Sequence, residues 1–183
     1  GEHHARQRRT LPPLLYMAAI RQANLPVDAF AVRLQMGADG PGQACRDLGA
    51  VSALLDRFAS LDKPLTVTCC GVPAGPTPAP TGVDAPTAPE EVFPSGSWRG
   101  PWSDSLQADW LSALAAVVFS KPGVQALCWQ DAIDTTTARE MPLGGLLTAA
   151  GTPRAAAQRL AQVRAALREK RAIPARLPGG PRA

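Results

Sequence analysis

The feature that most constrains this chain is a helical pattern followed by a strand pattern, which occurs three times. Segments 10–24, 44–62 and 104–120 carry apolar residues at helical spacing, and each precedes a short apolar segment, at 28–36, 63–69 and 121–131. A last helical pattern covers 152–170. Alternating helices and strands are typical of parallel sheets, because each helix returns the chain to the same end of the sheet. The pattern predicts an α/β fold.

Several helix starts are also marked by residue type. Thr10 is a candidate cap before the prolines of the first helix, and Asp104 supplies the acidic residue that a helix N-terminus prefers. Thr152, just before Pro153, is the expected start of the last helix. The three strand and helix units fit either part of a (β/α)₈ barrel or a small doubly wound sheet. No glycine-rich phosphate-binding motif follows a strand, which favours the barrel.

Composition sets the class of protein. The 183 residues are 45% hydrophobic and 19% charged, which suits one globular domain with a real core. No run approaches the roughly 18 apolar residues of a membrane-spanning helix, and no compartment is assigned. The net charge of +4 is concentrated near the end of the chain, at Arg164, Arg168, Lys170, Arg171, Arg176 and Arg182.

This basic end has no interleaved aromatic residues, so a solvated tail is favoured over binding to nucleic acid or to a membrane. We therefore expect a barrel-like domain over 1–172 and a disordered basic tail over 173–183, with neither a nucleic-acid nor a membrane partner. A Pro, Gly and Thr-rich connection near thirty residues long runs from Gly71 to about Pro101. Connections of this length are usually functional or disordered.

The cysteines give little support for a metal or a cofactor, and none is predicted. The four thiols, at 45, 69, 70 and 128, lack the paired spacing of a zinc site, and His3 and His4 lie in a charged end. Successive strand residues point to opposite faces, so a disulfide between Cys69 and Cys70 is disfavoured. Structural thiols are the favoured interpretation.

Four landmarks then occur in a recognisable order: "PVDAFAVRLQ" at 26–35, "KPLTVTCCGV" at 63–72, Gln107 with Trp110, and a strand ending in Trp129 that leads to an Asp-bearing loop and "GLL" at 145–147. This order resembles the C-terminal part of the family 10 glycoside hydrolases, the endo-β-1,4-xylanases, over about 14–167. The resemblance implies strands six to eight of a (β/α)₈ barrel, a β-linked polysaccharide or oligosaccharide as partner, and an N-terminal barrel half in the same polypeptide. Three strands cannot close a barrel alone.

The catalytic residues of that family are not carried over. The resemblance puts Cys69 at the position of the nucleophilic glutamate, Arg33 at the position of a glutamine and Gln35 at the position of a histidine. It implies that Cys70, on the opposite face of the strand, points toward the helices. Retaining hydrolysis needs two carboxyl groups roughly 5–5.5 Å apart. The usual glycosidase mechanism is thus expected to be lost here. Cys69 as a thiolate nucleophile beside Arg33 is the less favoured alternative, since no histidine follows these strands to act as base.

Aromatic residues suit a carbohydrate site better, because sugar rings stack on indoles. The candidate substrate-binding residues are Arg33, Gln35, Trp98, Trp102, Trp129, Gln130, Asp131 and Asp134. Each has a structural alternative: the two loop tryptophans could pin the loop, Trp129 could be core, and the two aspartates could cap helices. Two functions remain open, a glycosidase-like enzyme and a non-catalytic module that binds carbohydrate or serves a structural role.

Overall fold

The computed structural model describes residues 12–38, 42–76, 95–135, 141 and 143–174. Within them the chain alternates between helices and strands, as the sequence pattern predicts. The elements are α1 Pro13–Gln22, β1 Phe30–Gln35, α2 Leu48–Ala59, β2 Leu65–Gly71, α3 Asp104–Phe119, β3 Val124–Trp129 and α4 Ala155–Arg168.

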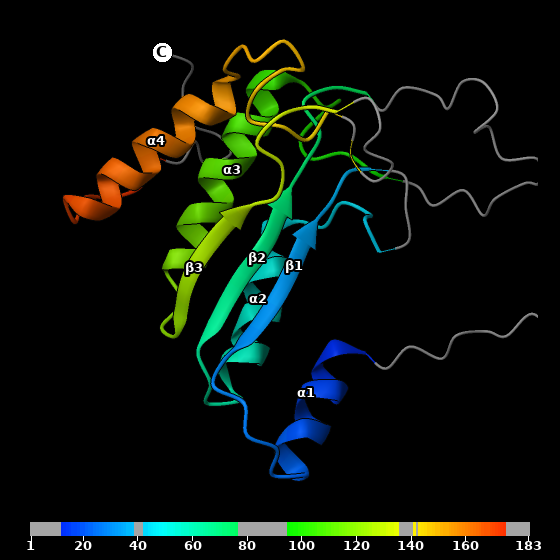
Figure 1. Cartoon of the computed structure of the whole chain (residues 1–183), viewed down its shortest axis with the longest axis vertical. Coiled ribbons are helices and arrows are strands. Elements are labelled where there is room, and N and C mark those ends of the chain that lie inside the picture. The colour runs from blue at the N-terminus through cyan, green and yellow to red at the C-terminus, as the bar shows by residue number, and fades with distance from the viewer. Residues whose placement is uncertain (1–11, 39–41, 77–94, 136–140, 142, 175–183) are drawn as a thin grey trace, which may run out of the picture.

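The three strands form one parallel sheet in the order β1-β2-β3. Figure 1 views this sheet from the face turned away from α2 and α3, with α2 behind the strands and all three strands ending at the same edge. We call the face toward the viewer the open face and the shared edge the carboxyl edge. Parallel pairing of consecutive strands is what the helical crossovers require.

The hydrophobic core lies between the sheet and the helices. Along β1, Phe30, Val32 and Leu34 are buried while Ala31 and Arg33 are exposed. The buried side chains pack in one cluster with α2 and α3, whose fully buried members include Val51, Leu55, Trp110 and Leu114. Burying an aliphatic side chain of this size contributes about 1.5–3 kcal/mol. The alternation along β1 therefore orients one face of the strand to the core and the other to the open face.

One marked helix start behaves as the sequence indicates and another does not. Ser103 caps α3 by accepting a hydrogen bond from the backbone N–H of Leu106 at 3.2 Å, and Asp104 lies in the first turn. The last helix begins at Ala155 rather than at Thr152, so that prediction was wrong. The backbone N–H of Arg154 donates to the Leu146 carbonyl, and this extended pairing keeps the preceding residues out of the helix.

The predicted cap Thr10 lies outside the described residues, as do His3, His4 and the tail from residue 175 onward. The boundary expected at 172/173 therefore stays a prediction. In the described ranges no helix combines the length and apolarity that a membrane crossing demands.

Candidate functional site

A β-bulge in the middle strand shapes the carboxyl edge. Between β1 and β2, Val32 pairs with Val67 but Arg33 pairs with Cys69, which leaves Thr68 as an extra residue of β2. A bulge of this kind bends the strand and redirects its side chains. After it, Cys69 lies beside Arg33 on the open face.

The same bulge faces β3 on the other side. Val67 pairs with Leu127 and Cys70 pairs with Trp129, so Cys128 alone lies opposite the two residues Thr68 and Cys69. Since Trp129 packs toward the core, the alternation along β3 places Cys128 on the open face. Cys69 and Cys128 are therefore neighbours across two strands.

These positions form two rows across the carboxyl edge of the open face. The first row runs through Arg33, Cys69 and Cys128. The second row lies one step nearer the strand ends, because Gln35 pairs with Gly71 and the N–H of Gln130 donates to the Cys70 carbonyl at 2.8 Å. We call them the carboxyl-end rows, and their members are Arg33, Cys69, Cys128, Gln35, Gly71 and Gln130.

Two predicted sugar-binding residues in these rows contact each other. Nε of Arg33 donates to Oε1 of Gln35 at 2.8 Å, and the same oxygen accepts a second bond from the guanidinium. Gln35 is buried and Arg33 is exposed. The Arg33 guanidinium is planar and positively charged, and its hydrogen bonds to Gln35 orient it on the open face.

The two adjacent cysteines of β2 lie in different environments. Cys70 is fully buried in the core, on the side of the helices as predicted. Burial raises the pKa of the Cys70 thiol, and the nearby Cys128 and Cys69 raise it further. Cys69 is partly exposed and Cys128 is exposed, and all four described cysteines are free thiols. Accessible thiol chemistry at this edge thus belongs to Cys69 and Cys128.

Trp129 is anchored at the end of β3. Its Nε1 donates to the Gly144 carbonyl at 2.8 Å. Its ring meets that of Trp110 edge to face, with centroids 6.3 Å apart and an interplanar angle of 73°. Such a pair adds about 0.5–1.5 kcal/mol beyond simple burial. Trp129 is half-buried rather than fully enclosed, so part of its surface remains accessible at the carboxyl edge.

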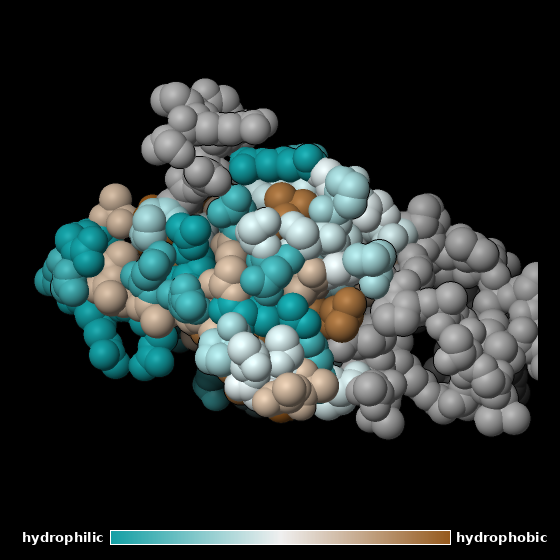
Figure 2. All heavy atoms as spheres, turned by 90° about the horizontal axis from the view of Figure 1, so that it is seen from above, coloured by the Kyte–Doolittle hydropathy of each residue, from teal (hydrophilic) through white to brown (hydrophobic). Residues whose placement is uncertain are grey.

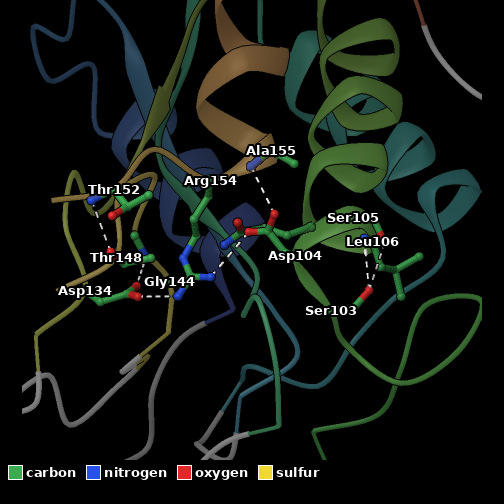
Figure 3. A network of polar contacts seen from close by, with 12 residues as sticks. Ser103, Asp104, Ser105, Leu106, Asp134, Gly144, Thr148, Thr152, Arg154 and Ala155 are labelled. Carbon is green, nitrogen blue, oxygen red and sulfur yellow. Dashed lines mark hydrogen bonds and ion pairs between the residues drawn. The ribbon is translucent and has the colours of Figure 1, made fainter. Parts of the chain in front are cut away.

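An ion-pair network holds the loop that follows β3 (Figure 3). Asp134 is buried, accepts the N–H of Gly145 at 2.8 Å and pairs with the guanidinium of Arg154. Arg154 also reaches Asp104 at 3.3 Å, and Asp104 accepts the N–H of Ala155 at 3.1 Å. Burial lowers the pKa of Arg154, but the hydrogen bonds and charges of the two aspartates outweigh it and the net shift is upward. The network joins the β3–α4 loop to the starts of α3 and α4.

The remaining polar candidates lie near this loop. Gln130 is exposed, and Asp131 is half-buried. The Asp131 carbonyl accepts the N–H of Leu146 at 3.2 Å. Gly144 lies against the carboxylate of Asp131, since a Cβ there would sit 3.2 Å from Oδ2. Gln130 is therefore the more accessible of the pair.

The loop tryptophans are buried in the core cluster rather than presented at the surface. Trp98 is 7% and Trp102 is 8% exposed. A Cβ added to Gly37 would come within 2.5 Å of the Trp102 indole, so the ring packs directly on the backbone after β1. Arg99 stacks on Trp98 with its guanidinium carbon 4.0 Å from the ring centroid. These contacts match the loop-pinning alternative, and sugar binding by either residue stays a prediction.

Figure 2 views the carboxyl edge from above, where mostly polar and neutral residues surround small separate hydrophobic patches. The side chains of the carboxyl-end rows include a cation, two thiols and two amides but no carboxylate. Retaining hydrolysis therefore has no nucleophile or acid among them, whereas hydrogen bonding to hydroxyl groups is available.

Sequence reasoning treated Cys128 as a structural thiol and missed Arg154. Alternation along "VQALCW" puts Cys128 on the face opposite to Leu127 and Trp129 but does not say which face is open, and no local signal marks the partners of Arg154.

This chain is similar to known proteins in its fold rather than in its sequence. No protein-family model matches the sequence, and no curated protein matches it significantly. The structure is similar to xylanase 10B of Thermotoga maritima, with a TM-score of 0.59 at 13% identity over 86% of this chain and 43% of that one. It is also similar to a thermostable mutant of the Cellvibrio japonicus xylanase Xyn10A, with a TM-score of 0.53 at 10% identity over 79% and 42%.

A third similar structure is the intracellular xylanase of Thermoanaerobacterium saccharolyticum, solved in complex with xylotetraose. It gives a TM-score of 0.50 at 12% identity over 78% of this chain and 36% of that one. This chain thus spans less than half the length of each xylanase. What the likeness establishes is the fold: these residues form an α/β unit that corresponds to part of a xylanase (β/α)₈ barrel.

Proposed function

We propose that this chain is part of a glycoside hydrolase-like barrel that binds a β-linked polysaccharide or oligosaccharide at the carboxyl-end rows. In this proposal the retaining two-carboxylate mechanism is lost in this chain. The supporting observation is the position of Cys69, which a bulge turns onto the open face at the carboxyl edge of a xylanase-like fold. Active sites of (β/α)₈ barrels lie at this edge.

The chemistry of the rows suits binding better than bond cleavage. Arg33 and Gln130 are exposed and offer hydrogen-bond donors, and the half-buried Trp129 lies at the same edge. Sugars are recognised by a stacking aromatic surface together with a few placed polar groups. A neutral thiol at position 69 does not supply the carboxylate that a glycosyl-enzyme intermediate requires.

The other strands of the barrel belong, in this proposal, to the same polypeptide. The described strand order leaves β1 and β3 each paired on one side, and a barrel needs further strands to close. Helix α1 exposes Leu15 and Tyr16 at 58% and 56%. A neighbouring strand and helix unit would cover this apolar surface.

Binding is tested by titrating the chain with xylotetraose and, separately, with cellotetraose while tryptophan fluorescence is recorded. Gln130→Ala should weaken binding about tenfold, which corresponds to about 1.4 kcal/mol. Gln125→Ala is the matched control, because Gln125 is also exposed but lies at the opposite end of β3. No fluorescence change with either sugar, or equal loss in both variants, would contradict a carbohydrate site at this edge.

Loss of hydrolysis is tested separately with reducing-sugar release from xylan. The unmodified chain and Cys69→Glu are both expected to release none, because one carboxylate does not replace the required pair. Release by the unmodified chain would overturn the proposed loss of mechanism. A non-catalytic role is also favoured by the use of Trp98, Trp102 and Asp134 in packing and ion pairing.

A further inference from the structure

The carboxyl-end rows contain two accessible thiols on neighbouring strands. Cys128 lies opposite Cys69 in the paired strands β2 and β3, and both are on the open face. Neighbouring strands lie about 4.8 Å apart. Disulfides span Cα separations of roughly 4.4–6.8 Å. The spacing between the two strands is therefore within the range that a disulfide bridges.

The other two cysteines do not share this arrangement. Cys70 is fully buried on the opposite face of the sheet, and burial keeps its thiol protonated by raising the pKa. Cys45 belongs to the segment before α2, where its N–H donates to the Ser95 carbonyl at 2.7 Å. Among the described cysteines, only Cys69 and Cys128 are on the same face of the sheet and accessible.

A positive charge lies in the same row. Arg33 is the direct partner of Cys69 on β1, is exposed, and is oriented by its bonds to Gln35. A cation beside a reactive thiol attracts anionic reagents and speeds their encounter. Small disulfides that carry carboxylates, such as oxidised glutathione, have the charge that this row favours.

We infer that Cys69 and Cys128 form a thiol-disulfide exchange site for a small anionic disulfide. The exposed Cys128 thiolate attacks one sulfur of the reagent, forms a mixed disulfide and expels one thiolate. The Cys69 thiolate then attacks Cys128 in the mixed disulfide and expels the second thiolate. The protein loses two electrons to the reagent, and the two protons of its thiols pass to the leaving groups. The product is a disulfide between β2 and β3.

The test is to incubate the folded chain with oxidised glutathione and to analyse it by intact mass and tryptic mapping without reduction. The expected product is lighter by two hydrogen atoms. Trypsin cleaves after Arg99 and so leaves Cys69 and Cys70 on the peptide 58–99 and Cys128 on the peptide 100–139, within which the Lys63–Pro64 and Lys121–Pro122 bonds resist cleavage. The disulfide should therefore join these two peptides.

Variants assign the bond to its residues. Cys69→Ser and Cys128→Ser should each abolish the cross-linked peptide, and the control Cys70→Val should retain it. Arg33→Met should slow the reaction roughly tenfold at low salt, with Arg33→Lys close to the unmodified rate. A glutathione adduct that persists on Cys128, an unreacted chain, or a cross-link that survives Cys69→Ser would overturn the inference. An unchanged rate in Arg33→Met would overturn the role of the charge.

Discussion

Two regions at the carboxyl edge each contain an arginine and use it in different ways. At the end of β3 Trp129 is bonded to Gly144, and in the loop that follows Asp134 is buried against Arg154. In the carboxyl-end rows, Arg33 and the thiols of Cys69 and Cys128 reach the open face. The first region is held by contacts within the chain, whereas the second presents side chains to whatever lies above the sheet. Arg154 and Arg33 have the same side chain, so their surroundings decide that the first is structural and the second is a candidate binding residue.

The largest effect should come from breaking the loop network with Arg154→Met. The substitution leaves Asp134, whose side chain is 6% exposed, as a buried charge without its partner. We expect a loss of about 3 kcal/mol in the free energy of unfolding, measured by urea denaturation. The control is Arg159→Met on the same helix, since the Arg159–Asp109 pair is longer at 3.6 Å and more exposed. That control should cost under about 1 kcal/mol. Equal effects would remove the contrast between the regions.

A smaller effect is expected from the buried thiol of β2 at alkaline pH. The pKa of Cys70 is raised in the folded state by burial, so only the unfolded chain ionises this thiol above about pH 8.5. Its contribution to stability is complete below that pH and is lost as the pH rises, by up to about 1.4 kcal/mol per pH unit.

Cys70→Val should make the alkaline decline in unfolding free energy less steep, as measured by urea denaturation between pH 8 and pH 10. Cys128→Val is the control, because Cys128 is an exposed thiol on the neighbouring strand. A decline of the same slope in Cys70→Val and the unmodified chain would show that the two cysteines of β2 do not differ as described.

The smallest effect on stability is expected in the rows themselves. Gln130→Ala and Gln125→Ala both remove exposed amides and should each change the free energy of unfolding by less than about 0.5 kcal/mol. Thermal unfolding followed by circular dichroism measures both. A loss near 2 kcal/mol in Gln130→Ala would place this residue with the packed loop rather than with the accessible rows.

Much of the fold was predictable because it depends on local patterns. Apolar spacing located the seven elements that the described residues form. The expected direction of Cys70 is confirmed, but a bulge turns this side chain to the core, whereas simple alternation from Leu65 and Val67 would have placed Cys69 there. The predicted start of the last helix was wrong because the backbone N–H of Arg154 donates to Leu146, and the folded loop is what brings Leu146 close. Capping preferences act within a few residues, so they do not register a competing partner brought close by folding.

The sequence by itself determined the alternation of helices and strands, the parallel sheet, and the polar and aromatic residues that follow the strands. Only the tertiary structure decided that Trp98 and Trp102 pack in the core, that Asp134 is paired with Arg154, and that a bulge places Cys128 beside Cys69. The physical reason is that the preference for a helix or a strand is set by residues close together in the sequence. Burial, ion pairing and strand register depend on groups far apart in the chain, and these meet only when the sheet and its loops assemble.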